Sequence, residues 1–126
     1  MVVIDTNVII DHLRQKGSSD SLLSKLLKQI ELNEAAISFI TIQELFAGQS
    51  TINKEIEEWI LKIINPYQIL PYTFEVAKLA GEIDRDSKNQ IDFPDAAIAA
   101  TAILNKTSLL TLNKKDFKGI KDLKLI

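Results

Sequence analysis

The sequence predicts an α/β fold, a three-layer α/β/α sandwich in which helices cover both faces of a central, mostly parallel sheet. Short apolar runs alternate with helical patterns of about 10–15 residues, which is typical of βαβ units. The chain has 126 residues, 46% of them apolar, which corresponds to a single domain spanning 1–126. The expected strands cover residues 2–5, 35–40, 68–70, 108–112 and 123–126.

The expected helices cover residues 21–32, 54–64, 74–86 and about 92–104, after a first helix that directly follows the first strand. Segment 54–64 repeats apolar residues at helical spacing. It should end at Asn65-Pro66, because a proline clashes with a continuing helical turn. Alanines in the last segment would let its backbone lie close to the sheet.

The composition excludes several classes of chemistry. Fifteen basic and seventeen acidic residues give a net charge of −2, which provides no bulk attraction to nucleic acid or to an anionic membrane. The absence of cysteine excludes disulfides and thiolate sites, and a single histidine excludes metal sites built from several histidines. No apolar run approaches the roughly 20 residues that span a bilayer, and no signal peptide is recognisable. We expect a cytoplasmic protein that uses carboxylates, hydroxyls, amides and lysines.

Four acidic residues lie at or just beyond the ends of expected strands or at the start of a helix. Asp5 closes the first strand, and Glu44 follows the second strand, in what should be the first turn of the next helix. Asp95 lies in the first turn of the alanine-rich helix, and Asp116 follows the fourth strand. Because ligand sites of parallel sheets form outside the carboxyl ends of the strands, these four acids could meet at one edge.

A cluster of four carboxylates requires a proton or a cation. Two like charges about 5 Å apart repel by about 3 kcal/mol at an effective dielectric constant near 20. Oxygen ligands without histidine or cysteine suit Mg²⁺ or Mn²⁺. One or two such ions could bind a phosphodiester and lower the pKa of a water molecule. The pattern therefore indicates a nuclease-like site.

Each acid also has a simpler explanation. Glu44 and Thr41 match a capping box, in which the glutamate only returns a hydrogen bond to the cap residue. Asp92 is a natural N-cap, and Asp95 could favour the helix dipole. The acid after the fourth strand could be an exposed turn residue. Asp5 is the hardest to explain in this way, because it ends an otherwise apolar strand.

Four segments resemble motifs of the PIN-domain superfamily, and specifically of its VapC toxins. Residues 3–10 resemble the amino-terminal signature of PIN domains, with the sequence VIDTNVII. Residues 38–45 match the second-acid segment S-x-x-x-x-x-E-L. Residues 95–102 resemble the element D-x-x-I-A-A-x-A, and residues 111–117 resemble T-x-N-x-x-D-F. The four matches occur in the family's order and extend over the whole chain.

The resemblance implies a PIN-like fold with a metal centre and supporting polar residues. An acidic quartet would hold Mg²⁺ or Mn²⁺ and activate water: Asp5, Glu44, Asp95 and Asp116. Asp5 and Asp95 would be the most direct ligands. Thr6 and Asn7 would orient Asp5, and Thr111 and Asn113 would support Asp116. Asp92 has no counterpart in these motifs, so it either caps its helix or lies near the metal.

The resemblance also implies an activity and partners. The protein would be an endoribonuclease, the toxin of a type II, VapBC-like toxin–antitoxin pair, which cleaves RNA such as tRNA or rRNA by metal-activated water. A small VapB-like antitoxin would cover a groove formed by the apolar helices, and the chain would form a homodimer without contacting a membrane. Two alternatives remain open. One is a haloacid-dehalogenase-like phosphatase with Asp5 as nucleophile, although Asn7 could not serve as its second acid. The other is a non-catalytic interaction module.

Basic residues gather near these motifs although the net charge is negative. Five lysines follow residue 113, against two aspartates, and Arg85 and Lys88 precede Asp92. These residues could steer phosphates toward the metal or form an ordinary solvated face. His12 could shuttle protons, but an isolated surface histidine usually has no such role.

Overall fold

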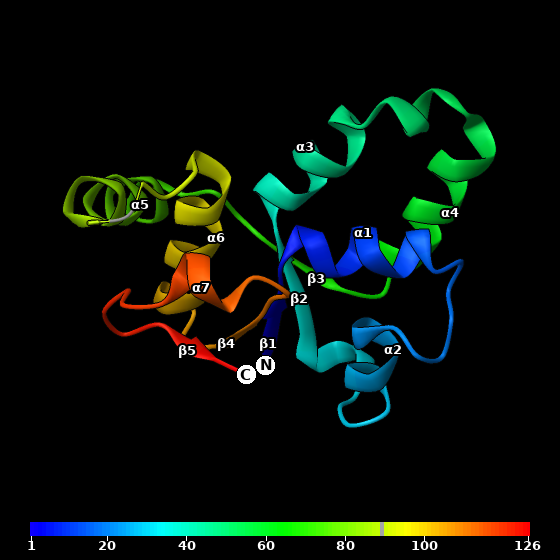
Figure 1. Cartoon of the computed structure of the whole chain (residues 1–126), viewed down its shortest axis with the longest axis horizontal. Coiled ribbons are helices and arrows are strands. Elements are labelled where there is room, and N and C mark those ends of the chain that lie inside the picture. Colours follow the sequence, from blue (N-terminus) through cyan, green and yellow to red (C-terminus); the bar gives the residue numbers. More distant parts are fainter. Residues whose placement is uncertain (89) are drawn as a thin grey trace.

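Five parallel strands form the centre of the molecule in the computed structural model, which describes residues 1–88 and 90–126 (Figure 1). They are β1 (Val2–Ile4), β2 (Ala35–Ser38), β3 (Gln68–Leu70), β4 (Ser108–Leu110) and β5 (Lys124–Leu125). The strand order is β3-β2-β1-β4-β5, and every pairing is parallel. β1 and β4 therefore lie side by side although most of the chain separates them.

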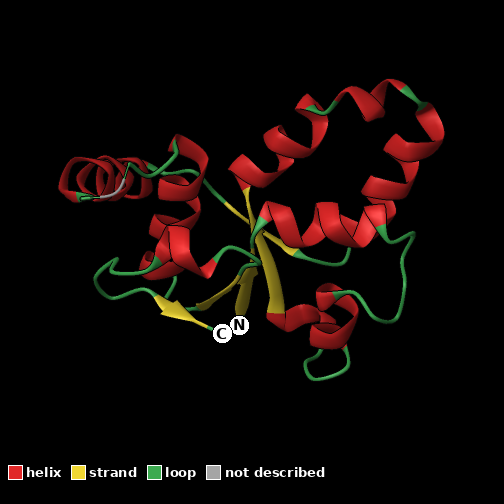
Figure 2. Cartoon of the chain, viewed as in Figure 1, coloured by secondary structure: helices red, strands yellow, loops and turns green. Residues whose placement is uncertain are grey.

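Helices cover both faces of this sheet, as Figure 2 shows. On one face lie α1 (Thr6–Arg14), α2 (Leu22–Leu27), α3 (Phe39–Ala47) and α4 (Lys54–Ile64). On the other lie α5 (Phe74–Asp86), α6 (Phe93–Leu104) and α7 (Lys114–Phe117). Two 3₁₀ turns, Leu32–Glu34 and Gln49–Ile52, complete the described elements. The predicted three-layer α/β/α fold is confirmed. Within the described residues, no helix is long and apolar enough to cross a bilayer.

The central strands are buried on both faces, which explains their nearly continuous apolar sequence. In β1, Val2 and Ile4 belong to the core beneath α1 and α2, whereas Val3 packs with Ile98 on the face covered by α6. The alanines of α6 are almost completely buried. Their small side chains allow α6 to lie close to the sheet, as its composition predicted.

Several predicted elements are shorter in the structure: the strands expected over 2–5, 108–112 and 123–126 are Val2–Ile4, Ser108–Leu110 and Lys124–Leu125. The strand expected over 35–40 stops at Ser38, because the Ser38 hydroxyl accepts a hydrogen bond from the Ile40 amide at 3.2 Å and begins α3. Glu44 consequently lies in the second turn of α3, not in the first. The helix expected over 21–32 is only Leu22–Leu27, and Leu32 is 49% exposed in a 3₁₀ turn.

Candidate active site

The carboxyl ends of the central strands carry the starts of several helices. Asp5 follows β1 and is the N-cap residue of α1, α3 follows β2, and α7 comes shortly after β4. α6 begins at the same edge from the opposite layer, with Asp95 in its first turn (Figure 1). This arrangement brings acidic residues from four separate segments toward one edge of the sheet.

Asp5 is held rigidly between β1 and β4. Its side chain is buried, with 3% exposure, and its Oδ2 accepts a hydrogen bond of 2.7 Å from the Thr111 hydroxyl. Its amide donates to the Leu110 carbonyl at 2.9 Å. Burial raises the pKa of Asp5, the Thr111 hydrogen bond opposes this rise, and the charge of Glu44 adds to it. Asp5 is therefore a preoriented acid with a raised pKa, next to another negative charge.

Thr111 is itself oriented by its neighbours. Its oxygen accepts from the Asn113 amide at 3.0 Å and lies 3.4 Å from the side-chain nitrogen of Asn7. The Asn7 oxygen in turn accepts from the Leu112 amide at 3.3 Å. The single hydroxyl proton of Thr111 is thereby directed at Asp5. Asn7, Thr111 and Asn113 thus form one network around Asp5, whereas we expected Thr111 and Asn113 to support Asp116.

Glu44 is held by a hydroxyl from the first motif. Thr6 donates to the Oε1 of Glu44 at 2.7 Å, and the same hydroxyl lies 3.0 Å from that of Thr41. The Thr6 hydroxyl therefore positions Glu44, while the backbone amide of Thr6 interacts with Asp5 and lowers the pKa of that carboxyl. The capping-box explanation is wrong, because Ser38 is the N-cap of α3 and Thr41 is a buried residue within the helix. Thr41 contacts the hydroxyl that holds Glu44, a role that the sequence analysis missed. The sequence indicated Thr41 only as the first residue of a capping box with Glu44.

Asp95 has the most perturbed acid–base equilibrium of the site. Partial burial, together with neighbouring negative charges, raises its pKa to about 7, against a usual value of 3.8. The charges that contribute to this rise are those of Asp5, Asp92, Glu44 and Asp116. The structure thus places all other members of the acidic quartet, together with Asp92, near enough to act on one carboxyl group. A group titrating near neutral pH is typical of functional sites.

Asp92 and Asp116 are the exposed acids of this cluster. Asp92 occupies the N-cap position of α6, but its side chain makes no capping hydrogen bond. The capping role that we considered for Asp92 is therefore not seen. Asp116 lies in α7 and also lines a neighbouring cavity.

The donor set fits a hard divalent cation. In the part of the chain that the structure describes, no three His, Cys, Asp or Glu side chains are already gathered tightly enough to share one ion. Mg²⁺ is commonly held by only one or two carboxylates and keeps several of its waters. The oxygen-only ligands and the mutual repulsion around Asp95 match that chemistry. Within this cluster Asp5 is buried, Glu44 and Asp95 are half-buried, and Asp92 and Asp116 are exposed.

His12 has a structural setting outside this cluster. It lies near the C-terminal end of α1, and its Nδ1 is 2.7 Å from the Ser21 hydroxyl, the N-cap of α2. Burial lowers the pKa of His12, and the charge of Asp11 opposes this change. The histidine thus ties α1 to α2.

Comparison with known proteins places this geometry in a family. The model of the PIN domain family matches residues 2–123. The chain belongs to the PIN domain family. Ribonuclease VapC1 of Rickettsia felis is 34% identical over 133 residues, covering 99% of this chain and 94% of that protein. Ribonuclease VapC10 of Mycobacterium tuberculosis is 32% identical over 127 residues, covering 98% and 91%.

Solved structures agree with this assignment. The crystal structure of VapBC2 from Rickettsia felis, bound to a DNA fragment from its promoter, superimposes with a TM-score of 0.80 at 28% identity. The match covers 100% of this PIN domain and 98% of that chain. The predicted resemblance to PIN domains, and within them to VapC toxins, is confirmed.

Proposed function

We propose that this PIN domain is a Mg²⁺- or Mn²⁺-dependent endoribonuclease and the toxin of a type II toxin–antitoxin pair. The observation that carries the proposal is the set of four negative charges that act on the half-buried carboxyl of Asp95. Such a cluster is stabilised by a cation. Its relatives are named ribonucleases, which supports RNA as the substrate.

The residues of the acidic cluster and their hydrogen-bond partners would have separate roles. Asp5 and Asp95 would hold the ion, and Glu44 and Asp116 would add negative charge around it. When bound, the ion would lower the pKa of a water molecule and offset negative charge at the scissile phosphate. Thr111 would keep Asp5, and Thr6 would keep Glu44, in a fixed orientation, which lowers the reorganisation needed during the reaction. A quartet carboxylate or bulk water would accept the proton from the attacking water.

The two alternative functions have less support. A phosphatase would require Asp5 to attack phosphorus, but Asp5 is buried and its Oδ2 is engaged by Thr111. The family match is also to PIN domains. A non-catalytic module would not need a carboxyl group with a pKa near 7 in the midst of four other acids.

Cleavage assays in the presence and absence of metal test the proposed function. The purified chain should cleave tRNA or rRNA in millimolar Mg²⁺ or Mn²⁺, and it should be inactive in EDTA. Because only the ionised form of Asp95 binds a cation, the rate at limiting metal should fall about tenfold per pH unit below about 7 and level off above it. Sequencing the RNA ends and measuring rates from pH 5.5 to 8.5 checks both expectations. Equal cleavage in EDTA would contradict the metal centre.

The proposal includes a small antitoxin as partner, a homodimer of the chain, and action in the cytoplasm, where tRNA and rRNA occur. Solved relatives are toxin–antitoxin complexes, which supports the antitoxin. Large apolar side chains are exposed on the side formed by α2 to α4, among them Leu32, Ile52 and Leu61. We propose that the antitoxin covers some of these side chains.

A charge introduced at Leu32 should weaken antitoxin binding more than it changes stability. Leu32 is 49% exposed, so Leu32→Glu should cost little folding free energy but should place an unpaired charge in the complex. We expect at least tenfold weaker binding to the co-expressed cognate antitoxin by calorimetry. Leu104→Glu is a matched control, because Leu104 is 45% exposed at the end of α6 on the opposite face. Equal loss of affinity in both variants would exclude this surface.

A further inference from the structure

Glu44 lies on a helix that has few buried side chains. In α3 only Thr41 and Leu45 are buried. Ile42 and Phe46 pack against the core but are only partly buried. Figure 1 shows α3 extending away from the sheet, beginning at the end of β2. One of the two buried side chains that hold this helix in place is therefore polar.

The Thr41 hydroxyl is not used within its own helix. In α6 the equally buried Thr101 donates to the Ala97 carbonyl of the same helix at 2.7 Å, as helical threonines commonly do. Thr41 is also 0% exposed, but among the described residues its hydroxyl has one hydrogen-bond partner, the Thr6 oxygen at 3.0 Å. The hydroxyl of Thr41 thus connects α3 to α1.

The number of protons fixes the direction of the hydrogen bonds around Thr6. Thr6 has one hydroxyl proton, and an ionised carboxylate can only accept, so this proton points to the Oε1 of Glu44 at 2.7 Å. The proton between the two threonine oxygens must then come from Thr41. A hydroxyl that accepts a hydrogen bond becomes a stronger donor. Donation therefore runs from Thr41 to Thr6 and from Thr6 to Glu44.

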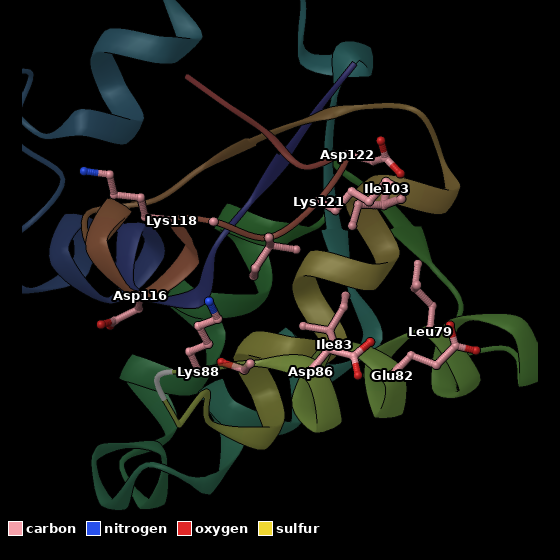
Figure 3. A pocket seen from close by; sticks show the side chains of 13 residues that line it. Leu79, Glu82, Ile83, Asp86, Lys88, Ile103, Asp116, Lys118, Lys121 and Asp122 are labelled. Carbon is pink, nitrogen blue, oxygen red and sulfur yellow. The ribbon is translucent and has the colours of Figure 1, made fainter.

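Two other acids of the cluster are held differently. Asp5 accepts directly from the Thr111 hydroxyl. Asp116 is exposed, and Figure 3 shows its side chain at the border of the neighbouring cavity, on the same side as Lys88. Loss of the hydroxyl that donates to Thr6 should therefore disturb Glu44 and leave Asp116 unchanged.

We propose that Thr41 is a positioning residue of the acidic cluster, which acts on Glu44 through Thr6. Its hydroxyl keeps the Thr6 proton directed to Glu44 and holds α3 against α1. The charge of Glu44 acts on Asp5, so the place of α3 decides how these two carboxylates face a cation. The inference rests on the proposed metal-dependent function and adds to it a buried side chain that touches none of the four acids through a hydrogen bond of its own.

Binding of Mn²⁺ to the metal-free chain tests this inference without RNA. Free Mn²⁺ is followed by electron paramagnetic resonance during titration at pH 8. Thr41→Val keeps the shape and removes the hydroxyl, so it should bind Mn²⁺ about three- to tenfold more weakly than the native chain. Thr41→Ser keeps the hydroxyl and should stay within about twofold of the native affinity. Thr101→Val is the matched control, because it removes an equally buried hydroxyl that is bonded within α6 and approaches the Ser38 oxygen only to 3.5 Å.

Two further measurements decide whether Thr41 acts through Thr6. In a Thr6→Val background, Thr41→Val should change the Mn²⁺ affinity by less than about twofold, because the chain of hydroxyls is already broken. In the metal-free protein, the carboxyl ¹³C NMR signal of Glu44 should shift in Thr41→Val and return in Thr41→Ser. The signal of Asp116 should not move in either variant.

Equal weakening in Thr41→Val and Thr101→Val would overturn the inference, even if the native chain binds metal and cleaves RNA. An undiminished effect of Thr41→Val in the absence of the Thr6 hydroxyl would do the same. A measurement on the native chain needs no variant: a Thr41 hydroxyl proton that exchanges freely with water would also contradict the inference. If the Glu44 signal responds as expected but the native chain binds no Mn²⁺, the metal-dependent function is overturned while the positioning of Glu44 stands.

Discussion

Replacing Asp95 with asparagine should abolish RNA cleavage and, in metal-free buffer, stabilise the fold. The folded-state pKa of Asp95 is about 7 against a usual 3.8, so the native protein favours the protonated acid. The associated stability is complete below pH 3.8 and is lost as the pH rises through 7. Above pH 7 the ionised group opposes folding, and asparagine removes that charge. We expect a gain of about 1–3 kcal/mol at pH 8, because partial solvation screens the repulsion.

Thermal unfolding at several pH values measures this effect. The melting temperature of the Asp95→Asn variant should depend less on pH between 5 and 8 than that of the native chain. Millimolar Mg²⁺ should raise the melting temperature of the native chain and have a smaller effect on the variant. Asp84→Asn is a suitable control, because Asp84 is an exposed acid on α5 and the substitution removes the same charge. If both substitutions change stability equally at pH 8, the proposed repulsion at Asp95 is refuted.

The variant Thr111→Val should lower cleavage about 10- to 100-fold, although Thr111 itself is not proposed to bind the metal. Valine has nearly the shape of threonine but cannot donate the 2.7 Å hydrogen bond to Asp5. The buried Asp5 carboxylate would then lack this donor, which should also cost about 1–3 kcal/mol of stability. Its pKa would rise further, so the rate should need a higher pH to reach its plateau.

Two comparisons separate this effect from a general loss of packing. Thr107→Val is the matched control, because Thr107 is also buried beside β4 and its hydroxyl lies 3.4 Å from a backbone carbonyl of α6, at the other end of that strand. It should leave the rate within about twofold. In an Asp5→Asn background, Thr111→Val should cost clearly less stability than in the native chain. An equal cost in both backgrounds would show that Thr111 acts by packing alone.

Local signals explain which parts of the fold were predictable. The helices expected over 54–64 and 74–86 have those boundaries in the structure: Asn65-Pro66 follows the first, and the side chains of Asn53 and Thr73 cap the two N-termini. The ends expected at residues 32 and 40 are wrong, since apolar residues continue past Leu27 and past Ser38, where the serine hydroxyl begins the next helix. Sequence patterns locate an element better than they locate an end set by distant contacts.

In the candidate site, the acidic residues could be predicted from the sequence, whereas their hydrogen-bond partners could not. The acids could be predicted from their positions at strand ends and from the family motifs, because parallel strands deliver their carboxyl ends to one edge. Their hydrogen-bond partners could not. Thr111 and Asp5 are 106 positions apart, and their contact depends on the pairing of β1 with β4. The Thr6 side chain reaches Glu44 because α1 and α3 lie in contact.

Because β1 pairs with β4, the acidic cluster can assemble only after the C-terminal part of the chain has been synthesised. A nascent chain emerging from the ribosome exposes Asp5 and Glu44 early, but Asp95, Thr111 and Asp116 are translated last. An incomplete nascent chain therefore carries only two of the four acids and should not cleave RNA. Activity should therefore begin only when synthesis is complete. An antitoxin synthesised nearby could bind the chain at that point, before it cleaves RNA.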